Sequence, residues 1–71
     1  MRIKVSGEPQ LVNDLRDHLR SVGCIAAVVA PGEVEATVPD APTDEQELRE
    51  LRAYLATWRA VRHAQTEILD S

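Results

Sequence analysis

The distribution of glycine and proline constrains the fold of this chain more than any other feature. All 3 glycines and 4 prolines lie within the first 42 residues, and none follows Pro42. Because these two residue types mark turns and end helices, the first part of the chain is divided into short elements. The remainder is free to form one long helix.

The first part of the chain shows a strand pattern and then a helix pattern. Residues 2–6 alternate between apolar and polar side chains, which predicts a half-buried strand. From Leu11 to Val22 the apolar residues recur at spacings of three and four, which predicts an amphipathic helix. Gly23 follows this helix and suits a left-handed cap at its C-terminal end.

Two further strands are predicted before Pro39. Residues 24–30 are continuously apolar and rich in β-branched side chains, whereas residues 33–38 alternate between apolar and polar. Pro31 and Gly32 between them occupy the central positions of a type II turn, so the two strands are predicted to form a hairpin.

The residues after the connector 39–42 predict one long helix. Thr43 precedes Gln46 by three positions, the spacing of a capping box at a helix start. The predicted helix continues to residue 69 and would be about 39 Å long, whereas a six-residue strand spans only about 20 Å. We therefore expect the end of the helix to overhang the sheet and to contact a partner; the alternative is that its last turns fray or fold back. Its apolar stripe comprises Leu48, Leu51, Leu55, Trp58, Val61, Ile68 and Leu69.

These elements predict one α+β domain, residues 1–71, in the order βαββα. A three-stranded sheet of order 1-3-2 would carry both helices on one face, as in a ferredoxin-like fold truncated before its fourth strand. The first strand would then have a free edge, where another strand could pair. We expect the helices to cover Ile25, Ala27 and Val29, which leaves Val28 on the opposite face and makes residues 24–30 apolar on both sides.

Residues 2–38 resemble, in topology, the half-ferredoxin modules of ACT-like and metal-chaperone-like domains. The resemblance to ACT-like domains implies binding of small molecules at paired interfaces. Metal-chaperone-like domains have a CxxC motif near the first loop, and residues 6–9 read Ser-Gly-Glu-Pro instead. Copper or zinc carriage is therefore not implied.

Composition argues against several classes of function. The chain has 12 acidic and 8 basic residues, a formal net charge of −4, and few aromatic side chains to stack on bases, so nucleic-acid binding is not favoured. No apolar run predicts a signal peptide or a membrane span. The single cysteine and the absence of these signals favour a cytoplasmic location, and the Arg- and Ala-rich composition indicates a GC-rich bacterial genome.

The chemically active residue types form no recognisable motif. His18 and His63 lie on predicted helices without catalytic neighbours, and Cys24 opens an apolar strand, where cysteine usually acts as a small hydrophobic residue. Neither a dinucleotide-binding nor a P-loop glycine motif occurs. We therefore predict no catalytic, metal-binding or cofactor-binding residues, no cofactor and no enzymatic activity.

Three hypotheses of function remain. The first is a protein-interaction or regulatory module, expected to be a homodimer because a 71-residue chain buries a small core. The second is an ACT-like small-molecule sensor, and the third is a nucleic-acid-associated regulator that uses the basic stripe Arg52, Arg59 and His63. The predicted interface residues are Trp58, Val61, Arg62, Gln65, Ile68, Leu69 and Val28.

Overall fold

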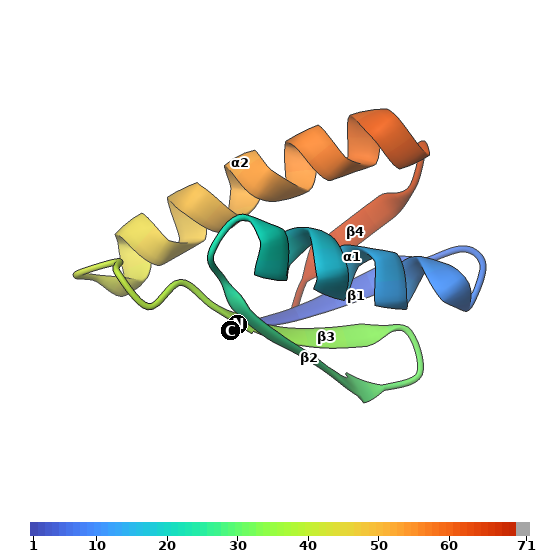
Figure 1. The fold of residues 1–71 in the computed structure, drawn as a ribbon, viewed down its shortest axis with the longest axis horizontal. Helices are drawn as coiled ribbons and strands as arrows, with labels where there is room; N and C mark the ends of the chain where they lie inside the picture. The colour runs from blue at the N-terminus through green and yellow to red at the C-terminus, as the bar shows by residue number, and fades with distance from the viewer. Residues whose placement is uncertain (70–71) are drawn as a thin grey trace.

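The computed structural model describes residues 1–69 and shows a small α+β fold with two helices and an antiparallel sheet (Figure 1). Both helices lie on the same side of the sheet (Figure 1). The elements in chain order are β1 (Arg2–Ser6), α1 (Gln10–Ser21), β2 (Ile25–Ala30), β3 (Glu33–Thr37), α2 (Asp44–Arg62) and β4 (Gln65–Ile68).

The sheet has four strands in the order β2-β3-β1-β4, and each neighbouring pair is antiparallel. The position of β3 between β1 and β2 agrees with the predicted order. The predicted three-stranded sheet is wrong, because β4 completes the βαββαβ ferredoxin-like arrangement. The predicted free edge of the first strand is also wrong, because β1 is bonded on both sides. The open edges belong to β2 and β4.

The predicted helix from residue 43 to residue 69 is also wrong in its last part. α2 ends at Arg62, and His63 takes a left-handed conformation with φ of 54° while its amide donates to the Arg59 carbonyl at 2.8 Å. The chain then reverses and β4 pairs with β1, from Ser6 opposite Gln65 to Ile3 opposite Ile68. The alternative of folding back is therefore the observed one, and residues 65–68 pair with β1 instead of extending the C-terminal end of α2 beyond the sheet.

The sequence does contain a signal for the end of the helix, although no glycine or proline marks it. A continued helix would place residues 62 and 65 on the buried face after Leu55 and Trp58, and both positions are polar. The β4 segment also carries β-branched residues, Thr66 and Ile68, at alternate positions, which is typical of a strand. Pairing with β4 covers the edge of β1 that a three-stranded sheet would leave open, so β1 becomes a central strand.

The C-terminal end of α1 decides which face of β2 is buried. The Gly23 amide donates to the Arg20 carbonyl at 3.2 Å and the Cys24 amide donates to the Leu19 carbonyl at 2.9 Å, the two bonds of a Schellman motif. This motif brings the Cys24 side chain against Leu19 in the core, as the hydrophobic contact of such caps requires. The predicted left-handed cap at Gly23, with φ of 95°, is confirmed.

The predicted orientation of β2 is wrong by one residue. Cys24 and Ala26 face the helices and are buried, whereas Ile25, Ala27 and Val29 are exposed. The sequence pattern could not decide between the two faces, because both are apolar. The buried side chains of residues 1–69 form one cluster: Ile3, Val5, Val12, Leu15, Leu19, Cys24, Ala26, Val34, Ala36, Val38, Leu51, Leu55 and Trp58.

The two predicted turn signals are confirmed. Gly32 has φ of 73°, as the third position of a type II turn requires, and its carbonyl accepts a hydrogen bond from the Val5 amide at 2.7 Å. Thr43 caps α2, because its hydroxyl oxygen accepts from the Gln46 amide at 3.1 Å. Within residues 1–69 we find no helix that is both long and apolar enough to cross a bilayer.

Candidate functional site

The free edge of β2 presents backbone groups whose direction follows from the neighbouring pairs. The amide and carbonyl of Ala36 both bond to Met1, at 2.8 and 2.6 Å. The Ala36 backbone groups therefore point toward β1, and Ala26, which lies opposite Ala36, forms no backbone hydrogen bonds with it. Because bonded and non-bonded pairs alternate, the amides and carbonyls of Ala26 and Val28 point away from β3. They form a row of donors and acceptors along the open edge.

The side chains along this β2 edge carry no charge. Ile25 is 64% exposed and Val29 is 45% exposed, and the six residues of β2 are all alanine, valine or isoleucine. Open edges in stable monomers are usually protected by charged residues, prolines or bulges. Here protection is partial: an irregularity in the pairing lies between Val28 and Ala30, and the Arg20 guanidinium donates to the Ala26 carbonyl at 2.9 Å.

The free edge of β4 is shorter. The Leu69 amide donates to the Arg2 carbonyl at 2.8 Å, so Leu69 and Arg2 form a hydrogen-bonded pair across β4 and β1. Because such pairs alternate with non-bonded ones, the backbone groups of Thr66 and Ile68 point to the open side. Their side chains face α2, since they are half-buried and the alternate residues of the strand, Gln65 and Glu67, are exposed.

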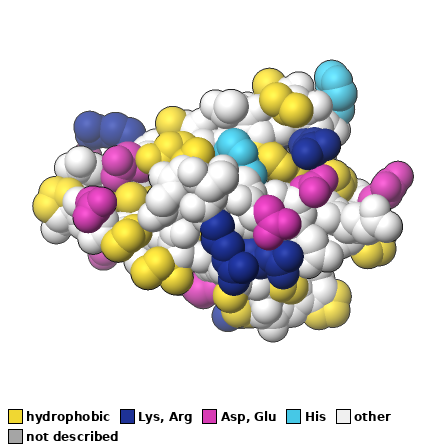
Figure 2. All heavy atoms as spheres, viewed as in Figure 1, with side chains coloured by type: hydrophobic (Ala, Val, Ile, Leu, Met, Phe, Trp, Pro, Cys, Tyr) yellow, Lys and Arg dark blue, Asp and Glu magenta, His cyan; other side chains and the backbone are white. Residues whose placement is uncertain are grey.

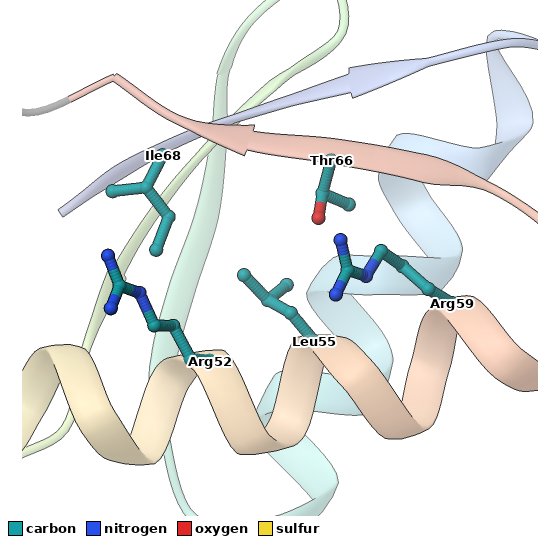
Figure 3. Close-up of a pocket in the computed structure, with 5 residues that line it drawn as sticks. All are labelled: Arg52, Leu55, Arg59, Thr66 and Ile68. Carbon is teal, nitrogen blue, oxygen red and sulfur yellow. The ribbon is translucent and has the colours of Figure 1, made fainter.

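A groove of about 330 Å³ lies between α2 and β4, and five residues line it. Arg52, Leu55 and Arg59 come from α2, whereas Thr66 and Ile68 come from β4 (Figure 3). The Arg52 guanidinium points toward Ile68, and the Arg59 guanidinium lies below the Thr66 hydroxyl (Figure 3). Within residues 1–69 neither arginine has a hydrogen bond or an ion pair. Two unpaired cations therefore flank an apolar floor.

The groove changes its charge toward the start of α2. A second hollow shares Arg52 and Ile68 with it and is lined further along by Met1, Leu48 and three acidic residues, Asp44, Glu45 and Glu47. These acidic residues occupy the first turn of α2, where the helix dipole favours negative charge. The cationic part of the groove is thus limited to the stretch between Arg52 and Arg59.

The seam between α1 and α2 contains two buried polar atoms without a hydrogen-bond partner among the described residues, Nε1 of Trp58 and Nε2 of His18. Both residues line a shallow hollow of about 310 Å³. Arg62 closes its rim through an ion pair with Asp14, at 3.6 Å. A water molecule bridging the two nitrogens would satisfy them, so this seam needs no further ligand to explain it.

The outer face of the sheet carries alternating charges. Arg2 lies 3.7 Å from both Glu33 and Glu35, and Lys4 is opposite Glu67 in the β1–β4 register. On the helix side, cationic and anionic side chains are also interspersed (Figure 2). Acidic side chains therefore lie next to the basic ones on both surfaces, which disfavours contact with a phosphate backbone.

The structure separates the residues of the predicted interface. Trp58 is only 3% exposed and belongs to the core, whereas Val61 is 67% exposed on α2. The helical face that was expected to unite them with Gln65, Ile68 and Leu69 does not exist, because these last three lie in or next to β4. Val28 is partly exposed at the β2 edge.

The predicted basic stripe is also divided. Arg52 and Arg59 line the same groove, as their helical spacing indicates. His63 caps the end of α2 and lines a different hollow, together with Gly7 and Ala64. The sequence placed the two arginines on one side of a helix, but it could not show the strand that forms the opposite wall.

Among the titratable groups of residues 1–69, the Cys24 thiol is the one whose pKa departs clearly from its ordinary value. Burial raises the pKa of the Cys24 thiol, and the negative charges of Glu50 and Glu47 raise it further. The thiol therefore stays protonated and unreactive at neutral pH. No group of three or more metal-ligating side chains occurs within residues 1–69.

We compared the chain with protein-family models, curated proteins and solved structures, and none gave a significant match.

Proposed function

We propose that this protein is a non-enzymatic interaction module of the cytoplasm that self-associates through the open edge of β2. The observation that carries the proposal is the β2 edge itself, which is uncharged, six residues long and bears exposed aliphatic side chains. The proposed interface is therefore the β2 edge, and not the C-terminal helix or the edge of the first strand that the sequence patterns favoured.

A second copy of the chain suits this edge because of symmetry. Two identical strands related by a twofold axis pair antiparallel. An axis at Ala27 would place the Ala26 backbone groups of one copy opposite those of Val28 of the other, and these are the groups that point outward. The same register sets Ile25 opposite Val29, so that two aliphatic pairs would flank the axis on the outer face.

The two alternatives receive less support. The ferredoxin-like arrangement is compatible with the hypothesis of an ACT-like sensor, since two paired sheets of this kind would create an interface where a small molecule could bind. The nucleic-acid hypothesis depended on a basic stripe, and that stripe is divided and adjoins acidic residues at the start of α2.

Light scattering coupled to size exclusion, over a wide range of concentrations, tests the proposal. We expect the wild type to dimerise, and Ile25→Lys to shift the equilibrium to monomer because the lysine would lie opposite Val29 of the other copy and would need to be desolvated there. Val61→Lys is the matched control, because Val61 is an aliphatic residue of similar exposure on α2, away from β2.

Each outcome decides between surfaces. Dissociation by Ile25→Lys alone supports the β2 edge. Dissociation by Val61→Lys alone would move the interface to α2 and reject the β2 proposal, as would a wild type that remains monomeric at the highest concentration.

A further inference from the structure

We infer that the groove between α2 and β4 binds an extended acidic peptide segment, which adds as a fifth strand to the open edge of β4 and places two alternate carboxylates between Arg52 and Arg59. This site is separate from the β2 edge and would receive a different kind of partner.

The backbone of β4 supplies the first part of the argument. The amides and carbonyls of Thr66 and Ile68 point to the open side, and no side chain among the described residues caps them. An added strand would bond to these groups, which is the usual way that a sheet edge captures an extended peptide. Main-chain bonds of this kind do not depend on the sequence of the peptide, so selectivity must come from the groove.

The charges of the groove supply that selectivity. Arg52 and Arg59 point toward β4 and have no partner among the described residues, and they lie on the same side of the sheet as the Thr66 and Ile68 side chains (Figure 3). Both guanidinium groups are exposed on this side of α2, and a carboxylate placed beside each of them could accept charge-assisted hydrogen bonds.

The spacing of the groove indicates alternate acidic residues. Side chains of a strand point to opposite faces in turn, so residues two apart lie on one face at about 7 Å. The two arginines are seven residues apart on α2, about 10 Å along its axis, and their flexible side chains can close the difference. An acid-x-acid segment therefore matches both cations, whereas two adjacent acidic residues would direct one carboxylate away from the groove.

The acidic end of the groove argues for a peptide over a nucleic acid. Asp44, Glu45 and Glu47 line the hollow that continues beyond Arg52. A uniformly charged phosphate backbone that followed the groove would meet these carboxylates, whereas a peptide can carry acids at two positions and neutral or basic residues further along.

A binding assay with synthetic peptides tests the inference. The probe is a fluorescent eight-residue peptide of threonine and serine with glutamates at two alternate positions, titrated by anisotropy. The first control peptide has glutamine at the same two positions, and the second has two adjacent glutamates and so the same charge. We expect the alternate peptide to bind about tenfold or more tightly than either control, because only its carboxylates reach both arginines.

Protein variants locate the binding. Arg52→Gln combined with Arg59→Gln is expected to weaken the alternate peptide to the level of the glutamine control. Arg49→Gln is the matched variant, since Arg49 lies on the same helix but is exposed beside Glu45 and does not line the groove. Ile25→Lys is expected to leave peptide binding unchanged.

Amide hydrogen exchange by NMR distinguishes strand addition from simple anion binding. Strand addition is expected to slow the exchange of the Thr66 and Ile68 amides when peptide is present. Unchanged exchange at both amides, or equal binding of the alternate and adjacent glutamate peptides, would overturn the inference in favour of small-anion or non-specific electrostatic binding. Binding that the double arginine variant retains would also overturn it, and so would the absence of peptide binding.

Discussion

At the scale of single residues, His63 shows how one side chain ends a helix without glycine or proline. An L-residue in the left-handed conformation costs roughly 1–2 kcal/mol. His63 adopts this conformation because the chain reverses there, which allows β4 to pair with β1.

We therefore expect His63→Gly to raise the free energy of unfolding by up to about 1 kcal/mol, because glycine adopts a positive φ without strain. Urea denaturation followed by circular dichroism measures this change. Ala60→Gly, an exposed position within α2, is the matched control and is expected to destabilise by about 1 kcal/mol. A loss of stability in both variants would show that His63 contributes through its side chain.

Cys24 provides a pH-dependent prediction. Burial keeps its thiol protonated in the folded state, whereas the thiol of the unfolded chain ionises above its ordinary pKa of about 8.5. The unfolded state then binds fewer protons than the folded state, so the free energy of unfolding falls as the pH rises above that value.

Urea denaturation under reducing conditions, at about pH 7 and about pH 9.5, measures this effect. Cys24→Ala removes the ionising group and is expected to lose less stability between the two pH values than the wild type does. An equal loss in the two proteins would show that other groups cause the pH dependence.

At the scale of the elements, the caps of α2 connect the helix to its neighbours. Thr43 satisfies the Gln46 amide, and the Glu47 carboxylate accepts from the Val38 amide at 2.9 Å, which ties the first turn of α2 to the end of β3. The sequence signal for this helix start was correct because capping depends on residues that are adjacent in the chain.

Thr43→Ala is expected to lower the free energy of unfolding by about 1 kcal/mol, because the Gln46 amide would lose its acceptor. Thr57→Ala is the matched control, since Thr57 is exposed within α2 and its hydroxyl donates to the Ala53 carbonyl at 3.2 Å. Because alanine is the better helix former, Thr57→Ala is expected to be neutral or slightly stabilising by thermal unfolding. Equal losses in the two variants would reject the role of the cap.

At the scale of the whole molecule, the core is small and one large residue contributes much of it. Trp58 is almost fully buried between α1 and α2, while its Nε1 has no hydrogen-bond partner among the described residues. Trp58 therefore stabilises the fold mainly by filling space, and a side chain so deeply buried cannot form the primary contact of an interface.

We expect Trp58→Ala to cost about 3–5 kcal/mol, which is a large part of the 5–15 kcal/mol or so that stabilises a typical domain. Trp58→Phe keeps an aromatic ring and removes an N–H that has no hydrogen-bond partner among the described residues, so its cost should be clearly smaller. Urea denaturation followed by circular dichroism compares the two variants. Equal costs would indicate that the indole N–H is bonded, for example to a water molecule in the seam.

The elements with local signals could be predicted from the sequence. Alternation predicted β1 and β3, periodicity predicted α1 and most of α2, and the turn at Gly32 and the caps at Gly23 and Thr43 followed from neighbouring residues. Each of these features depends on backbone conformation and on contacts within a few positions along the chain.

The end of α2, the buried face of β2 and the identity of the open edges depend on contacts between distant parts of the chain. The segment 65–68 becomes a strand because β1 offers it a row of unpaired backbone groups, and β1 is distant in sequence. The same pairing turns Thr66 and Ile68 toward Arg52 and Arg59 and so creates the cationic groove. Such contacts between distant segments leave little trace in a local pattern, which is why the candidate sites could not be read from the sequence alone.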